Sequence, residues 1–243
     1  MSWAALDDEL AVWRREGRDL PVWWRDDDAV AMTPALERLL EMSDRLGIVV
    51  HLAMVPAEAE ALGEGQYRAL VHGWGHVNHA PPEEKKAEFR GHRPLAVRLD
   101  EAKRGLARVQ ALFGARACAV FVPPWNRIAG DMGPGLAALG YRGLSAFGPR
   151  GAAVPGLVQV NTHLDPIDWR GNRSLVEEDV LLALVVRQLG ELRRGEVDAG
   201  EPYGVLTHHL VHDAPIWEFS ARLLAVLLEG GARAVDLKTE GMG

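Results

Sequence analysis

Short apolar runs alternate with helix-like segments along almost the whole chain, and this alternation is the strongest constraint on its fold. The stretch at 48–55 is apolar throughout except for one histidine, which is typical of a strand covered on both faces. Seven or eight repeats of strand and helix predict a parallel sheet covered by helices. With 243 residues, 48% apolar side chains and no linker, the sequence predicts one α/β domain over residues 1–243.

The spacing of apolar residues predicts where each element lies. Thr33 and Pro34 mark a helix start, because a hydroxyl can cap the helix and proline suits its first position. The predicted helices are 2–16, 34–46, 97–113, 133–139, 174–194 and 215–229. The predicted strands are 22–26, 48–55, 67–71, 117–122, 141–147, 157–162, 204–208 and 232–237. Polar and loop-forming residues at 73–94 predict an extended loop with one helical turn at 83–89.

Polar side chains gather where the predicted strands end, at Asp26 to Asp28, His72, Trp125, Asp165 to Asp168 and His208. In α/β barrels this carboxyl-terminal rim is where active sites are built. We therefore expect a barrel rather than an open sheet, with its functional site at that rim.

Composition narrows the choice of partners and location. A formal net charge of −7 argues against nucleic acid or an anionic membrane surface as a partner. The first residues lack a basic region followed by an apolar core, and no apolar run approaches the roughly 20 residues that span a bilayer. Both observations predict a cytoplasmic location. The single cysteine, Cys118, lies in an apolar run and cannot form an internal disulfide.

Three consecutive carboxylates, Asp26 to Asp28, end the first predicted strand. Like charges this close repel, so such a cluster is either a solvated turn or a site that holds a cation. His72 and His76 favour the second reading, because imidazoles at positions i and i+4 can reach one divalent ion at about 2.0–2.1 Å. An Asp/His/His set with open positions suits a catalytic zinc or a similar ion. His79 is a third candidate, better explained as a loop histidine.

The order of these pieces resembles the polysaccharide deacetylase family, also called the NodB-homology family or carbohydrate esterase family 4. The family's motifs are an Asp-Asp pair, H-[ST]-x-x-H, R-x-x-P-[YF], D-x-x-D-W and L-x-H. Their counterparts here, in the same order, are Asp27-Asp28, His72–His76, Phe121–Trp125, Asp165–Trp169 and Leu206–His208. The set spans most of the chain.

The resemblance implies a distorted (β/α)7 barrel and metal-dependent hydrolysis of an N-acetyl amide on an amino sugar or polysaccharide. It implies that Asp27 is the general base and His208 the general acid. It also implies that one divalent ion, expected to be Zn²⁺, is bound by Asp28, His72 and His76. A carbohydrate or small amide is the expected partner, with Trp125, Asp165, Asp168 and Trp169 as substrate-binding residues.

Several alternatives remain open at the level of sequence. The base and ligand pair can also be read as Asp26-Asp27, and His209 replaces His208 if the strand register slips by one residue. Val122 stands where the family has an arginine that orients the catalytic carboxylate, and Arg127 is not a clear substitute. Gly73 stands where the family has a hydroxyl.

Two other functions fit the same residues. One is the hydrolysis of another small intracellular amide at the same metal site. The other is an inactive barrel that binds carbohydrate or a protein, which the missing arginine favours and the Asp/His/His set opposes.

Overall fold

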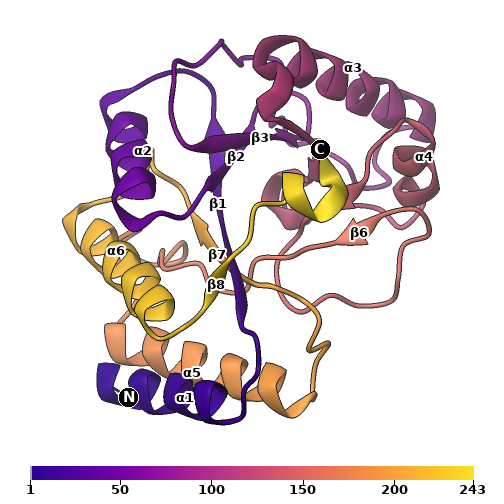
Figure 1. Cartoon of the computed structure of the whole chain (residues 1–243). Coiled ribbons are helices and arrows are strands. Elements are labelled where there is room, and N and C mark those ends of the chain that lie inside the picture. The colour runs from indigo at the N-terminus through magenta and orange to yellow at the C-terminus, as the bar shows by residue number, and fades with distance from the viewer. Residues whose placement is uncertain (1) are drawn as a thin grey trace.

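A computed structural model describes residues 2–243 and contains one parallel sheet wrapped by helices (Figure 1). Its strands are β1 (Pro21–Ala29), β2 (Val50–Met54), β3 (Tyr67–His72), β4 (Ala117–Val122), β5 (Gly143–Leu144), β6 (Val158–Gln159), β7 (Tyr203–Thr207) and β8 (Arg233–Ala234). Seven strands follow the order β6-β5-β4-β3-β2-β1-β7, and β8 pairs with the start of β1.

Residues 160–164 link the two ends of this order. The backbone N–H groups of Val160 and Thr162 donate to Leu144 and Ala146 on the β5 side. On the other side, His163 N–H donates to Gly204 O at 2.7 Å, and Leu206 N–H donates to Leu164 O at 2.8 Å. The sheet therefore curls into an irregular barrel, which confirms the predicted distorted (β/α)7 class.

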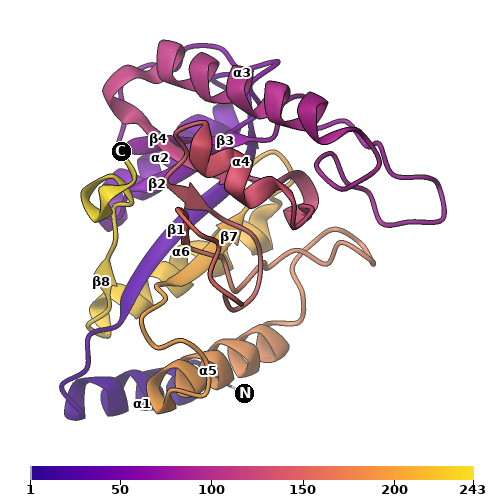
Figure 2. The same cartoon turned by 90° about the vertical axis from the view of Figure 1, so that its right-hand side faces the viewer.

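Six α-helices cover the outside of the sheet: α1 (Trp3–Arg15), α2 (Pro34–Leu46), α3 (Leu95–Phe113), α4 (Met132–Ala138), α5 (Glu178–Arg194) and α6 (Ala214–Glu229). They pack in pairs, α1 with α5, α2 with α6 and α3 with α4 (Figures 1 and 2). Short 3₁₀ turns lie at Gly114–Arg116 and Pro124–Asn126, and a π turn lies at Lys238–Met242. No helix within residues 2–243 is long and apolar enough to cross a bilayer.

Two apolar cores lie on opposite faces of the sheet. The larger core joins the outer face of the strands to the helices and includes Trp24, Leu52 and Val71. The smaller core fills the barrel and includes Trp23, Leu70 and Val120. Because side chains alternate along a strand, Trp23 and Trp24 belong to different cores, and the residues that follow them divide in the same way.

Most of the predicted elements are present, with helix α2 beginning as expected because Thr33 Oγ1 accepts from Leu36 N–H at 3.1 Å. The predictions at 141–147, 157–162 and 232–237 were too long, since each stretch contains a strand of only two residues. The helical turn expected at 83–89 was wrong: these residues form an irregular loop that projects from the barrel (Figure 2). The fifth helix begins at Glu178 rather than at 174.

Candidate active site

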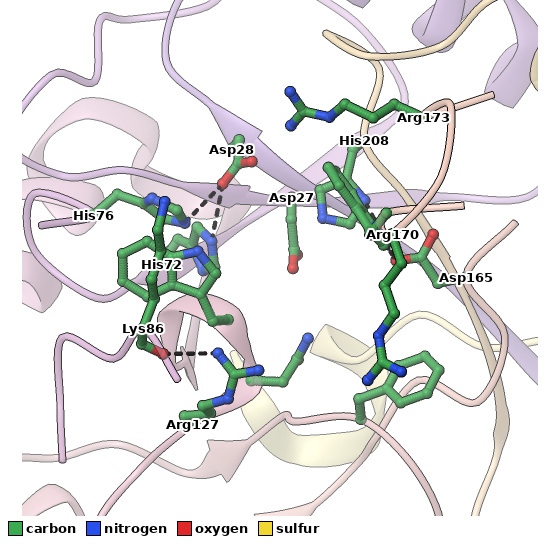
Figure 3. A pocket seen from close by; sticks show the side chains of 14 residues that line it. Asp27, Asp28, His72, His76, Lys86, Arg127, Asp165, Arg170, Arg173 and His208 are labelled. Carbon is green, nitrogen blue, oxygen red and sulfur yellow. Dashed lines mark hydrogen bonds and ion pairs between the residues drawn. The ribbon is translucent and has the colours of Figure 1, made fainter. Parts of the chain in front are cut away.

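The end of β1 divides its three carboxylates between two environments. Alternation places Arg25 and Asp27 on the inner face above Trp23, and Asp26 on the outer face with Trp24. The pairing of β1 with β2 then shifts register between Asp26 and Ala29. Asp28 lies at this irregularity with a left-handed φ of 69°, which few residues other than glycine adopt. The break in the strand directs the Asp28 carboxylate into the mouth of the barrel (Figure 3).

Asp28, His72 and His76 meet there. Their ligand atoms all lie within 4.8 Å of one another, and Asp28 Oδ1 is 3.2 Å from Nε2 of each histidine. His72 Nδ1 lies 3.1 Å from the Val122 carbonyl, which can only accept, so Nδ1 carries a proton and the other nitrogen faces Asp28. One carboxylate oxygen and two imidazole nitrogens form a donor set that fits a divalent ion with open positions.

The surroundings lower the pKa values of two members of this cluster, Asp28 and His76. Burial opposes ionisation of Asp28, but the hydrogen bond and positive charge of His72, together with His76, hold the pKa of Asp28 well below its usual range. Burial and the neighbouring His72 lower the pKa of His76. An imidazole with a lowered pKa is neutral near pH 7, which is the form that binds a metal.

The loop that carries His76 is held by the buried carboxylate of Glu88. Its Oε1 accepts from Gly75 N–H at 2.9 Å, and its Oε2 accepts from Trp74 N–H at 3.2 Å. These bonds fix His76 in a left-handed conformation, φ 54°. Glu88 lies twelve positions beyond His76 in the irregular loop, so sequence spacing alone gave no sign of its role.

The same loop explains why Gly73 replaces the family's hydroxyl residue. Gly73 has φ 59°, and a Cβ there would lie 2.2 Å from Glu88 Oε2 and 2.6 Å from two carbons of the Pro124 ring. Any side chain would therefore collide with the group that organises the loop.

Asp27 is held by an arginine from its own strand. Arg25 Nη2 donates to Asp27 Oδ2 at 3.0 Å, and Arg25 Nε lies 2.8 Å from Oδ1, so the guanidinium makes a two-point ionic contact with the carboxylate. Arg25 is fully buried, and its remaining N–H groups donate to Ser145 Oγ and Asn126 Oδ1, both at 2.7 Å. Arg25 thus makes the kind of contact with a carboxylate that the resemblance assigns to the arginine missing at Val122. Arg127 does not take this role, since it donates to the Lys86 carbonyl at 2.7 Å.

No motif indicated Arg25, but its position in the predicted strand could have done so. Residues i and i−2 of a strand share a face, so a basic residue two positions before a catalytic carboxylate is a candidate partner.

Asp26 lies outside the cavity. Its Oδ2 accepts from Thr207 Oγ1 at 2.6 Å and from His209 N–H at 3.0 Å, and its Oδ1 contacts His209 Nδ1. Asp26 and His209 are both buried, at 0% and 1% exposed. The geometry therefore places Asp27 and Asp28, rather than Asp26, at the cavity, and gives His209 a structural partner.

His208 lies across the cavity from the Asp28 cluster (Figure 3). Its Nδ1 is 3.9 Å from Asp165 Oδ2, and its ring packs edge-on against Trp169 with 4.8 Å between centroids. Asp165 is oriented by N–H groups of Trp169 and Ile167, at 2.7 and 3.1 Å. Burial raises the pKa of Asp165.

The cavity between these groups has a volume of about 880 Å³. Trp125 and Trp169 line it, as expected, and Trp125 packs against His76 with ring centroids 4.3 Å apart. Asp168 does not line it, contrary to the expectation for that residue: its Oδ1 accepts from Gly171 N–H at 3.0 Å and shapes a turn. The cavity also collects residues that no motif had indicated: Lys86, Asn126, Arg127, Phe147, Arg170 and Arg173.

The fold is that of the family 4 carbohydrate esterases, the NodB-homology fold that the motifs resemble. A putative polysaccharide deacetylase from Mycobacterium smegmatis superposes with a TM-score of 0.63 and 13% identity, covering 93% of this chain and 91% of that one. A family 4 carbohydrate esterase from Streptomyces lividans gives 0.54 and 15%, covering 91% and 94%. Peptidoglycan deacetylase PdaC from Bacillus subtilis gives 0.55 and 12%, covering 91% and 89%. No family model and no curated protein sequence matches the chain.

One further structure of this fold, at a TM-score of 0.54 and 13% identity, is a mutant of a family pseudoenzyme with restored activity. The fold by itself therefore leaves activity open, and any catalysis depends on the residues of the cavity.

Proposed function

We propose that the protein is a metal-dependent hydrolase that removes N-acetyl groups from an amino sugar or polysaccharide. The observation that carries this proposal is the placement of three functions around one cavity. Asp28, His72 and His76 form the donor set, Asp27 is held beside it by Arg25, and His208 lines the same cavity on the side away from His72 and His76. The deacetylases of the same fold support the choice of reaction.

Asp28, His72 and His76 would hold the ion, for which Zn²⁺ is the proposed identity. When bound, a divalent ion polarises a carbonyl and makes a coordinated water more acidic. The role of Asp27 is to accept the proton of the attacking water. The two-point contact with Arg25 fixes the orientation of its carboxylate, and a fixed orientation is what proton transfer in a cavity requires.

His208 is the proposed acid for the departing amine. It has two supports: Asp165 faces its Nδ1, and its backbone N–H donates to His212 Nε2 at 3.2 Å. Trp169 limits the movement of the ring. His208 directly follows β7, the strand that pairs with β1, and it lines the cavity on the side away from His72 and His76 (Figure 3). A substrate amide bound in the cavity can therefore take a proton from it on the nitrogen side.

The test combines metal analysis with acetate release from acetylated sugars and glycan fragments. We expect about one divalent ion per chain and acetate release that chelation abolishes. Asp27→Asn should retain the metal and lose turnover, whereas Asp26→Asn, its neighbour on the outer face, should retain both. A protein that binds metal but releases acetate from no acetylated compound would exclude the deacetylase.

A further inference from the structure

Four cations line the mouth of the cavity around an acidic floor. Lys86 and Arg127 lie on the His76 side, and Arg170 and Arg173 lie on the His208 side (Figure 3). We call these four residues the basic rim. The floor contains the carboxylates of Asp27, Asp28 and Asp165.

None of the floor carboxylates neutralises the rim. Asp27 is paired with Arg25, Asp28 contacts the two histidines, and Asp165 accepts from Trp169 and Ile167. Within residues 2–243 no member of the basic rim forms an ion pair with a carboxylate, although eleven arginines elsewhere do: Arg25, Arg68, Arg93, Arg98, Arg104, Arg116, Arg150, Arg187, Arg193, Arg194 and Arg233.

The position of the rim distinguishes its cations, because sixteen of the 27 lysines and arginines form no ion pair within residues 2–243. Four of these cations lie around one cavity. Four unpaired cations around one opening concentrate positive potential at the entrance, where it attracts anions and raises their local concentration.

Hydrogen bonds and a contact with an aromatic ring hold the turn that carries Arg170 and Arg173. Asp168 Oδ1 accepts from Gly171 N–H at 3.0 Å, and the Asp168 carbonyl accepts from Arg173 N–H at 3.0 Å. The Arg173 guanidinium lies over the Trp169 ring, 5.3 Å from its centroid. On the opposite side Arg127 is half-buried and donates to the Lys86 carbonyl at 2.7 Å, which ties the two cations of that side together.

Arginine side chains held in this way suit oxyanions. The guanidinium fork matches carboxylate and phosphate oxygens, and its orientation is already restricted before a ligand arrives. Neutral sugars gain nothing comparable from a ring of cations, because they have no charge to pair with.

We propose that the substrate is an anionic amide: an acetylated sugar or related compound that carries a carboxylate or phosphate group, which the basic rim binds while the amide reaches Asp27 and His208. This inference builds on the proposed function and specifies its substrate class. Arg170 and Arg173 are the residues expected to contribute most, because their turn faces the cavity from the side of His208.

The experiment compares binding and acetate release for three compounds: N-acetylglucosamine, N-acetylglucosamine 6-phosphate and N-acetylmuramic acid. They represent neutral, phosphate and carboxylate versions of one acetamido sugar. The wild-type protein, as purified, should bind at least one anionic compound about tenfold or more tightly than the neutral sugar in calorimetric titration. This preference should weaken as salt is added, because these are exposed charges.

The decisive variant is Arg170→Gln/Arg173→Gln, and its matched control is Arg45→Gln/Arg142→Gln, which removes two exposed arginines away from the cavity. The rim variant should lose about tenfold in affinity for the anionic compound while its metal content and its affinity for the neutral sugar stay unchanged. The control should behave like wild type.

The experiment distinguishes failure of the anionic-substrate proposal from failure of the deacetylase proposal. Preference for an anionic compound that the rim variant loses, without acetate release from any compound, would support the basic rim and exclude the deacetylase. Equal binding of neutral and anionic compounds, a preference that survives in the rim variant, or no anion binding at about 10 mM would overturn the anionic substrate. Phosphate and carboxylate groups are distinguished by which of the two anionic compounds binds more tightly.

Discussion

Asp26 and Asp28 lie two residues apart on one strand and illustrate how different two identical side chains become. Asp26 is fully buried on the outer face, where a hydroxyl, a backbone N–H and the His209 ring satisfy its oxygens. Asp28 follows a break in the strand pairing and remains one-third exposed, and its contacts are with two histidines that can also bind an ion. The first carboxylate closes a structural network, whereas the second is open to a ligand.

The difference comes from strand geometry rather than from the side chains themselves. Regular pleating sends Asp26 outward, and the register shift with a left-handed residue sends Asp28 towards the mouth of the barrel. His208 and His209 repeat the division at the end of β7: one lines the cavity and the other bonds to Asp26. In each pair, Asp26 with Asp28 and His209 with His208, the member outside the cavity is therefore a matched control for the member that lines it.

The largest expected difference between the two carboxylates concerns the metal. Asp28→Asn, His72→Ala and His76→Ala should each lose the bound ion, because three protein ligands leave no redundancy. Asp26→Asn should retain it. Metal content after dialysis against a weak chelator is the measurement, and far-ultraviolet circular dichroism verifies that each variant is folded. Retention of the ion in Asp28→Asn together with its loss in Asp26→Asn would reverse the division.

The next difference concerns His208 and His209. His208→Ala should leave metal content intact and reduce kcat by about 10²–10⁴, the usual contribution of one positioned proton donor. His209→Ala should lower thermal stability instead, since it removes the buried partner of Asp26. The readouts are kcat on the substrate that the panel identifies and the melting temperature. Normal turnover in His208→Ala would remove that residue from the mechanism.

The contacts of buried Asp26 should contribute measurably to the free energy of unfolding. Asp26→Asn breaks the contact between two fully buried groups and should reduce the free energy of unfolding by about 3 kcal/mol. Denaturant unfolding of the metal-free protein measures it without a contribution from ligand binding. Asp28→Asn is the control and should change this value much less, because that side chain is partly exposed.

A smaller effect is expected where Arg25 holds Asp27. Lysine presents a single ammonium group, so it cannot reproduce the two-point contact together with the bonds to Ser145 and Asn126. Arg25→Lys should therefore lower kcat by about 10- to 100-fold through misplacement of the carboxylate, with KM and metal content little changed.

Arg68→Lys is the matched control for this substitution, because Arg68 also pairs with a carboxylate but lies away from the cavity. It should leave kcat unchanged. Equal turnover in Arg25→Lys and wild type would mean that Asp27 needs no partner for its orientation.

Some parts of this site could be predicted from the sequence and others could not. The donor residues were predictable because the spacing of His72 and His76 and the order of strands bring them to one rim. Strands β2 and β4 were predictable because they are buried on both faces. Strands β5, β6 and β8 have only two residues each, and β6 and β8 are exposed, so apolar periodicity overestimated their length.

The supporting residues were harder to predict because their partners are distant in sequence or lie in loops. Glu88 acts through backbone N–H groups that any residue would present, so no side-chain pattern reveals its role. Asn126 reaches Arg25 across about one hundred positions. The basic rim is assembled from three separate segments, and only the fold brings its members to one opening.

The smallest effect that we expect is a dependence of stability on pH through His212. This residue contacts His208, the member of the His208–His209 pair that lines the cavity. Its Nε2 accepts from His208 N–H at 3.2 Å, and its ring packs edge-on against Trp217 at 4.6 Å. Burial lowers the pKa of His212 from 6.5 to about 4, with the positive charges of His208 and His209 acting in the same direction and Asp26 and Asp213 opposing it.

The sign of the effect follows from these values. Between about pH 6.5 and 4 the unfolded chain binds a proton at His212 that the folded chain does not, so stability falls as the pH falls through this window. At about pH 5.5 the loss should be roughly 1.4 kcal/mol relative to neutral pH, and below about pH 4 it should stop growing. His212→Gln has no proton to gain, while its amide can still accept from His208 N–H. Denaturant unfolding at neutral pH and at about pH 5.5 should therefore show a smaller loss of stability in His212→Gln than in wild type. An equal loss in both proteins would assign the pH dependence to other groups.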